Sequence, residues 1–480
     1  MQRPAPLLLS VVSLLSMTAL LGCPKKKDDT GGGATASSAT ASAAGSGSPV
    51  ATASASSAPS APELKPTCTV QNQKVWTKGV NTLTGLTAEE LPDGTDVVGL
   101  ALGNTPYVLV VKEGAAGGLK KVTVNPGSKF AKAPKAGEGT RIVWRVTPVK
   151  IEGANVRAFV DFRDEVKGAD PAGPKQRHVV CGPTDITERW VDWEGPAVLD
   201  DPKTSKDPVP AFVAAHHVTA ASPYREVRDC RTFFDPKRNE EWVVVSSFKV
   251  RMDGADAKPQ AELTIATPNS EGLVHATPMS ASPFKRIDYD TPISDELGDG
   301  SFFVAARAGG SLVASFMSHD KKPMGAPKSY PGYFQMPDIA RDGADTVLVA
   351  AQATGKGVQT LRGARVAGGK LPAGFTNVTD EDSAAHTASR PEFLRDDKGQ
   401  RWIAYLDDVE KGKGTLEIMP ISADFRSQGR AYAVSKDDEK ASEARLFAKP
   451  RGGFTVVYVR DGGAAGGELV SEDLDCKVEK

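Results

Sequence analysis

The 480-residue sequence has almost no net charge and few aromatic residues. Its 59 basic and 60 acidic residues leave a formal charge of -1. No extended positive field is therefore available to attract a polyanion, and nucleic acid is excluded as an expected partner. Aromatic side chains make up 6% of the chain, whereas Gly and Pro number 47 and 34. This balance favours many short strands joined by turns, and so an all-β fold.

Motifs that mark common catalytic and nucleotide-binding sites are also missing. The chain contains no HExxH zinc motif, no GxSxG nucleophile turn, no GxGxxG and no Walker-type phosphate loop. His216 and His217 are adjacent, so on a strand they point to opposite faces and do not share one metal. Asp380-Glu381-Asp382, close to His386, is interpreted as a solvated loop. We therefore expect no metal, no cofactor and no locally encoded catalytic residue.

A long hydrophobic run occurs only at the N-terminal end. Leu7–Leu21 follows the basic Arg3 and is about 15 residues long, short of the roughly 20 that a membrane-spanning helix needs. A basic start, an apolar segment and small residues before a cut are the three parts of an export signal. The segment ends in Leu20-Leu21-Gly22-Cys23. A simple secretory cleavage needs no cysteine, so Cys23 at the end of the segment indicates a modification beyond removal of the export signal.

The sequence Leu20-Leu21-Gly22-Cys23 resembles the lipobox of bacterial lipoproteins. The resemblance implies that a diacylglycerol is attached to the Cys23 thiol and that signal peptidase II cuts before it, which makes residues 1–22 the signal peptide. Two or three acyl chains, such as palmitate, make membrane anchoring effectively permanent. In enteric lipoproteins Asp in the next position retains the protein at the inner membrane. Pro24 occupies that position here, which favours the outer membrane of the cell envelope.

Residues 23–64 carry too few large apolar side chains to form a core. From Gly31 to Glu63 the chain has no aromatic residue, no Leu and no Ile, and Val50 is the one large branched apolar residue. Such a segment cannot bury enough surface to offset the entropy of ordering it. We predict a disordered linker with an end-to-end distance on the order of 35 Å, followed by a folded domain at residues 65–480.

Four cysteines follow Cys23, namely Cys68, Cys181, Cys230 and Cys476. Their spacing matches no CxxC or Cys/His zinc pattern. In an exported protein an even number of scattered cysteines indicates disulfides, and three pairings can be drawn. We favour Cys68 with Cys476, which would clasp the two ends of the folded domain, together with Cys181 with Cys230.

A unit of antiparallel strands recurs along residues 65–480. The clearest copy, Ser389–Ser422, is read as a short strand, an Asp-Asp-Lys-Gly turn and two further strands. The central strands of three copies, Val347–Ala350, Trp402–Leu406 and Phe454–Val459, begin about 52 to 55 residues apart. Fainter copies towards the N-terminus bring the number to seven. Recurrence at roughly 45 to 60 residues predicts a single β-propeller of about seven four-stranded blades, with six or eight as alternative counts.

The Ser389–Ser422 unit resembles the TolB-like and WD40-like propeller repeats. The matching positions are Pro391, Phe393, Asp396 or Asp397, Gly399 and Ile403-Ala404-Tyr405. The resemblance implies a propeller that binds partners on its disc faces, and it carries no catalytic residue across. Two β-sandwich domains joined near residue 190 are the alternative fold.

These features predict a monomeric envelope lipoprotein, anchored to the membrane through lipid on Cys23, whose propeller binds a protein, peptide or glycan partner without catalysis. The alternative is a propeller enzyme that cleaves glycans or peptides. Its acid, base and positioning arginines would come from different blades and leave no local motif. Carboxylates and arginines that converge at the centre of the propeller would favour the enzyme, whereas a dry or mixed surface would favour binding.

Overall fold

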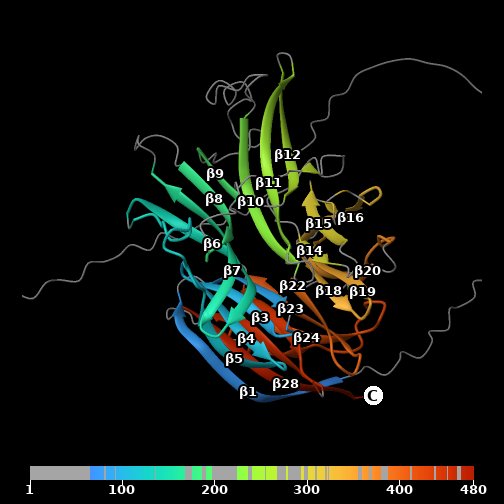
Figure 1. Cartoon of the computed structure of the whole chain (residues 1–480). Coiled ribbons are helices and arrows are strands. Elements are labelled where there is room, and N and C mark those ends of the chain that lie inside the picture. Colours follow the sequence, from blue (N-terminus) through green and yellow to red (C-terminus); the bar gives the residue numbers. More distant parts are fainter. Residues whose placement is uncertain are drawn as a thin grey trace, which may run out of the picture. The chain divides into compact units, whose positions relative to one another are not determined.

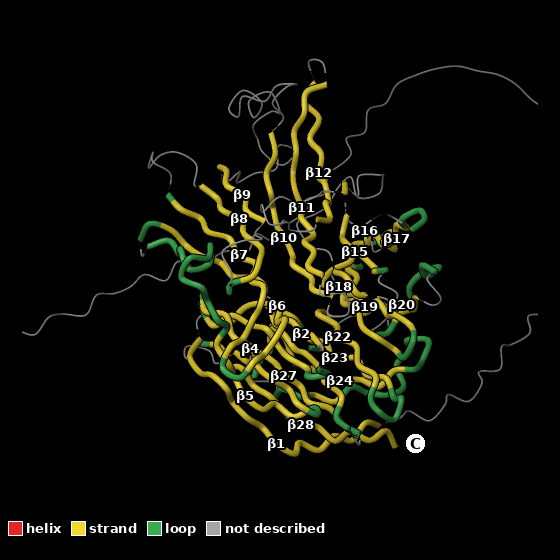
Figure 2. The backbone as a smooth tube through the Cα atoms, viewed as in Figure 1, coloured by secondary structure: helices red, strands yellow, loops and turns green. Residues whose placement is uncertain are grey.

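The computed structural model describes residues 65–80, 83–91, 93–135, 137–167, 176–185, 191–196, 224–235, 240–253, 256–266, 277–278, 293–296, 301–308, 311–318, 320, 322, 324–354, 359–366, 370–379, 387–410, 413–436, 439–450, 452–461 and 466–479. Ser60–Lys480 forms one compact unit. The regular secondary structure in the described residues is all β-strand, as Figure 2 shows. None of the described residues belongs to a helix long and apolar enough to cross a membrane.

The described strands form five four-stranded sheets and one eight-stranded sheet, and in the latter a single bridge joins two groups of four strands, so that seven four-stranded blades result. Figure 1 shows these blades. Blade 1 contains β2 (Leu83–Glu90), β3 (Asp96–Leu102), β4 (Thr105–Lys112) and β5 (Ala115–Lys121). Blade 2 contains β6 (Gly139–Glu152), β7 (Asn155–Val166), β8 (Gln176–Pro183) and β9 (Val191–Pro196). Blade 3 contains β10 (Tyr224–Asp235), β11 (Glu240–Asp253), β12 (Asp256–Ala266) and β13 (Thr277–Pro278). Blade 4 contains β14 (Ile293–Glu296), β15 (Phe302–Ala308), β16 (Ser311–Met317) and β17 (Lys328–Pro331).

The last three blades contain the strongest repeats of the sequence. Blade 5 contains β18 (Tyr333–Asp342), β19 (Asp345–Ala353), β20 (Gln359–Val366) and β21 (Thr376–Asn377). Blade 6 contains β22 (Ser389–Arg395), β23 (Arg401–Glu410), β24 (Lys413–Ile421) and β25 (Tyr432–Ala433). Blade 7 contains β26 (Ala441–Ala448), β27 (Phe454–Asp461) and β28 (Gly467–Glu479), and its fourth strand is β1 (Lys65–Val80) from the other end of the domain. A single bridge between Gly414 and Ala441 links the sheets of blades 6 and 7.

The first strand of each blade is the inner strand of a propeller. β2 lies against both β6 and β26, and β22 lies against both β18 and β26. Each blade then continues outward through its second, third and fourth strands by antiparallel pairing. The predicted all-β propeller of about seven blades is confirmed, and the alternative of two β-sandwich domains is wrong because residues 60–480 form a single unit.

The core consists of apolar layers between neighbouring blades. Val97 and Val108 of blade 1 pack with Val143 and Val160 of blade 2 in one such layer. Because a middle strand is covered on both faces, it is apolar at every position and shows no alternation. β19 follows this rule, since all of Val347–Ala351 is fully buried.

The Asp-x-x-Gly motif of blade 6 forms the turn that the sequence predicts. The Asp396 carboxylate accepts hydrogen bonds from the backbone amides of Lys398 (3.0 Å) and Gln400 (2.8 Å) and from Nε1 of the buried Trp402 (3.1 Å). Gly399 has a φ of +81°, a conformation that glycine adopts without strain. The turn therefore fixes the register of β22 and β23 and anchors the Trp402 ring.

The ring is closed by the two ends of the domain. β1 pairs antiparallel with β28 from Lys65 opposite Glu479 to Val80 opposite Gly467, and Figure 1 shows the two strands side by side. Cys68 and Cys476 are opposed in this register and are joined by a disulfide. The predicted clasp is thus present, although the sequence analysis did not anticipate the strand that carries it.

Candidate functional site

Charged side chains gather on the inner strands where blades 5, 6, 7, 1 and 2 meet. We call this group the inner-strand cluster. Its members are Glu89 on β2, Arg145 on β6, Asp338 on β18, Arg390 and Glu392 on β22, and Glu443 and Arg445 on β26.

Two arginine–glutamate contacts of opposite orientation join β22 to β26. Nη1 of Arg390 lies 2.9 Å from Oε1 of Glu443, and Nη1 of Arg445 lies 3.3 Å from Oε2 of Glu392. Both pairs span 53 residues, which is the repeat length of neighbouring blades. Residues two apart on a strand share a face. Blade 6 therefore presents Arg-x-Glu to the Glu-x-Arg of blade 7, and the charges are complementary at equivalent positions.

Arg390 occupies an unusual backbone conformation at the start of β22. Its φ is +51°, in the left-handed region that costs a non-glycine residue about 1 kcal/mol or more. The pairing of β22 with β23 shifts register between Ser389 and Glu392. The left-handed residue therefore coincides with a bulge in β22, and from it Arg390 contacts Glu443 of β26.

Arg445 is the centre of the cluster. Its guanidinium group interacts electrostatically with Glu392, Asp338, Glu443 and Glu89, and these charges raise the pKa of Arg445 even though burial opposes the rise. The four carboxyl groups come from blades 6, 5, 7 and 1. The Arg445 guanidinium group therefore lies in the electrostatic field of carboxyl groups from four blades and contacts Glu392 of blade 6 directly.

Backbone contacts extend the cluster from blade to blade. Oε2 of Glu443 accepts a hydrogen bond from the amide of Leu86 in blade 1 at 2.8 Å. Arg145 of blade 2 lies 3.3 Å from Glu89 of blade 1. Oδ2 of Asp338 faces the amide of Phe393 in blade 6 at 3.5 Å. Each carboxylate thus has a donor on a neighbouring blade.

Burial changes the acidity of three carboxyl groups in the cluster. It raises the pKa of Glu392 to about 8, an effect that the charge of Asp338 increases and that of Arg445 opposes. It raises the pKa of Asp338 to about 6, against the charge of Arg445. It also raises the pKa of Glu89, and Arg145 counteracts part of that rise. Near neutral pH the cluster therefore contains a protonated carboxyl group, Glu392, beside an ionised one, Asp338.

The cluster remains partly open to solvent. The Glu392 residue is 8% exposed, but the side chains of Arg390 and Arg445 are each 29% exposed and that of Glu89 is 32% exposed. Guanidinium groups supply hydrogen-bond donors and ionised carboxylates supply acceptors. The arrangement can therefore hydrogen-bond a polar ligand, and the two carboxyl groups of different acidity can give and take a proton.

A surface depression of about 560 Å³ lies elsewhere, between the outer strands of blades 6 and 7. Its lining includes Val70 and Gln73 of β1 and Tyr432 of β25. Gln73 already donates to Glu472, which also accepts from the Tyr458 hydroxyl. We place the candidate site at the inner-strand cluster instead, because its charged side chains come together from five blades.

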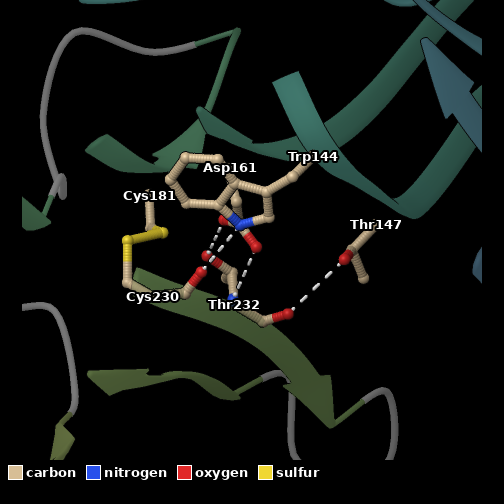
Figure 3. The surroundings of a disulfide bond; sticks show 6 residues. All are labelled: Trp144, Thr147, Asp161, Cys181, Cys230 and Thr232. Atoms are coloured by element: carbon tan, nitrogen blue, oxygen red, sulfur yellow. Dashed lines mark hydrogen bonds between the residues drawn. A yellow bond between two sulfur atoms is a disulfide. The ribbon is translucent and has the colours of Figure 1, made fainter. Parts of the chain in front are cut away.

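The second disulfide lies between two blades, as Figure 3 shows. Cys181 on β8 of blade 2 is bonded to Cys230 on β10 of blade 3, with their Cα atoms 6.1 Å apart. Beside it, Asp161 accepts hydrogen bonds from the hydroxyl (2.8 Å) and the amide (3.1 Å) of Thr232, and Nε1 of Trp144 donates to the Cys230 carbonyl at 3.2 Å. Both disulfides have the predicted pairing, and they indicate a protein of an oxidising compartment outside the cytoplasm.

The other residues singled out in the sequence lie outside the described residues. These are Cys23, His216, His217, Asp380 to Asp382 and His386. Within the described part of the chain no group of three His, Cys, Asp or Glu side chains is placed to hold a metal ion.

Sequence reasoning missed the inner-strand cluster. A signal was present, because Arg390 and Glu392 recur as Glu443 and Arg445 with reversed charge after one blade length. Charged residues at alternate positions are, however, the ordinary pattern of a strand with one solvent-facing side.

No family model and no curated protein sequence matches this chain. Among solved structures, a puromycin-hydrolysing peptidase of Mycobacterium tuberculosis has a TM-score of 0.41 and 10% identity, covering 82% of this chain and 52% of its own. A sialidase of Streptococcus pneumoniae has a TM-score of 0.38 and 9% identity, covering 79% and 83% of the two chains. A protein of unknown function from Dyadobacter fermentans has a TM-score of 0.35 and 12% identity, covering 69% and 94%. This chain spans about half the length of the peptidase, and likenesses at this level do not transfer an activity.

Proposed function

We propose that this protein is a lipid-anchored envelope protein whose propeller binds the polar groups of a peptide or glycan at the inner-strand cluster. The observation that carries the site is the convergence of Glu392, Asp338 and Arg445 from three blades onto one partly exposed position. The same convergence also supports the second candidate function, an enzyme. Donors and acceptors in near balance suit a neutral polar ligand better than a polyanion.

The lipid anchor is supported by Leu20-Leu21-Gly22-Cys23 and by the linker-like composition that follows it. The two disulfides agree with export, on which lipid attachment to Cys23 depends. Growth with labelled palmitate tests the anchor. The full chain is expected to carry label in the membrane fraction, and Cys23→Ala is expected to carry none and to leave that fraction. Label retained by Cys23→Ala would contradict the anchor.

Binding is tested with the full chain on immobilised envelope glycans and peptides. Arg445→Met removes the central guanidinium group, and its expected effect is at least a tenfold loss of affinity, because a hydrogen bond from a charged donor to the ligand is worth about 1.5 to 3 kcal/mol. Lys413→Met is the matched control, since Lys413 also forms an inter-blade ion pair, with Asp461, but outside the cluster. Equal binding by Arg445→Met and Lys413→Met would reject the cluster as the site.

A hydrolase is the second candidate, and the different acidities of Glu392 and Asp338 favour it. A general acid must be protonated and a general base ionised at the working pH. Asp338, ionised above a pH of about 6, would be the general base, and Glu392, protonated below a pH of about 8, would be the general acid. The full chain, assayed for product release on the same panel, would then show a bell-shaped pH profile. Loss of its alkaline limb in Glu392→Gln would establish the acid, whereas no turnover by the wild-type protein would reject the hydrolase.

A further inference from the structure

The first and last residues of the folded domain lie next to each other. Lys65, the first residue of β1, lies opposite Glu479 at the end of β28. β1 is the outermost strand of blade 7, whereas β28 is paired on both sides, with β1 and with β27. A pull on the N-terminal end therefore enters the domain through its edge strand.

An antiparallel strand pulled from one end separates pair by pair, because its hydrogen bonds run perpendicular to the strands and carry the load one after another. The side-chain links between the two strands lie further along. Asn72 donates to Asp473, Gln73 to Glu472 and Trp76 to Ser471. These links would resist peeling only after the first pairs had opened.

The Cys68–Cys476 disulfide lies ahead of all three links. Cys68 is three positions after Lys65, so only the first few residue pairs between β1 and β28 can separate before the disulfide bears the force. Cys476 is 7% exposed and belongs to the apolar layer between blades 6 and 7, with Leu474 and Val470. The bond thus transmits the pull from an edge strand to a buried, doubly paired strand.

The bond also encloses almost the whole domain. Its two cysteines are 408 residues apart. With the bond intact, a force between the N-terminal and C-terminal ends can extend only the segments outside it, residues 1–67 and 477–480. We propose that the Cys68–Cys476 disulfide is a mechanical latch, which lets the propeller stay folded when it is pulled between its N-terminal and C-terminal ends. The latch acts whatever holds the N-terminal end, and so does not depend on the lipid at Cys23.

Single-molecule stretching of the full chain between its ends tests the latch. The wild-type protein is expected to show no domain extension at forces that unfold ordinary domains. Cys68→Ala/Cys476→Ala is expected to peel at low force and to release the 408-residue interval less the 49 residues that Cys181–Cys230 keeps closed, an extension of about 1,200 Å at roughly 3.4 Å per residue. Cys181→Ala/Cys230→Ala is the matched control, because it loses a disulfide but keeps the latch, and it is expected to show no such release.

Cys476 contributes to a core layer, so the alanine variant risks misfolding. Cys68→Val/Cys476→Val keeps an apolar side chain of similar volume in that layer and provides a second unlatched protein. A wild-type chain that extends by about 1,200 Å under non-reducing conditions would overturn the latch. So would a folded valine variant that resists the same force without extension.

Discussion

The junction of blades 2 and 3 is built differently from that of blades 6 and 7. Blades 2 and 3 are joined by Cys181–Cys230 and by the hydrogen bonds of the buried Asp161 with Thr232. Blades 6 and 7 share a single backbone bridge, and their inner strands are joined by the pairs of Arg390 with Glu443 and Glu392 with Arg445. The first junction is covalent, and the second depends on protonation.

Because of this difference, the two junctions should respond differently to a change in pH. A disulfide stabilises the folded state mainly by restricting the unfolded chain, so its contribution does not change across neutral pH. A carboxyl group with a shifted pKa makes stability depend on pH. The Cys181–Cys230 bond and the inner-strand cluster should therefore respond to different conditions, the first to reducing agents and the second to pH, and substitutions at one should leave the response of the other unchanged.

The largest effect is expected from removing the inter-blade disulfide. Its cysteines are 49 residues apart, and closing a loop of that length is worth about 4 kcal/mol on the loop-entropy estimate. Cys181→Ala/Cys230→Ala should therefore lower the free energy of unfolding by about that amount. Denaturant titration at pH 5 and pH 9 measures it. A loss that differs between the two pH values would break the proposed separation of the two responses.

Glu392 should make the protein less stable as the pH rises. Its pKa is about 8 in the folded protein, above the ordinary glutamate value of about 4.3 in an unfolded chain. The unfolded chain thus releases a proton that the folded protein keeps, and stability is fully present below about pH 4 and falls as the pH rises to about 8. Glu392→Gln removes this pH-dependent loss. Its free energy of unfolding should therefore rise relative to that of the wild-type protein by on the order of 3 kcal/mol between pH 5 and pH 9.

Denaturant titration of both proteins across that range gives the comparison directly. Glu468→Gln is a suitable control, because Glu468 pairs with Arg460 of the same blade and lies outside the inner-strand cluster. Parallel pH curves for Glu392→Gln and wild type would contradict the assignment of the pH response to Glu392.

The fold could be predicted from the sequence wherever its signals were local. The turn at Asp396 and Gly399 uses residues four apart or fewer, and it formed as expected. The buried strand at Trp402 was recognised because every position is apolar. Both properties are visible in a short window of sequence.

Features that depend on a neighbouring blade could not be predicted in the same way. β1 is a polar strand of 16 residues with several register shifts, and it became recognisable only as the partner of β28. Glu392 looks like a solvent-facing residue until blade 7 places Arg445 against it. The disulfides link residues far apart in the sequence, yet their pairing was predicted correctly. The reason is that Cys68 and Cys476 lie at the two ends of the domain, where a bond between them closes the ring, and only one pair of cysteines then remains.

The smallest effect is expected from an ion pair that also spans blades 6 and 7 but lies at the surface. Nζ of Lys413 is 2.5 Å from Oδ2 of Asp461, and the Lys413 side chain is 45% exposed. Water and salt screen such a pair, which typically contributes between about 0 and 1 kcal/mol. Lys413→Met should therefore change the free energy of unfolding by less than about 0.5 kcal/mol, with no added pH dependence. A loss of about 3 kcal/mol or more, the size expected when one partner of a buried ion pair is removed, would mean that charge anywhere in this junction holds the blades together, and the inner-strand position would lose its special importance.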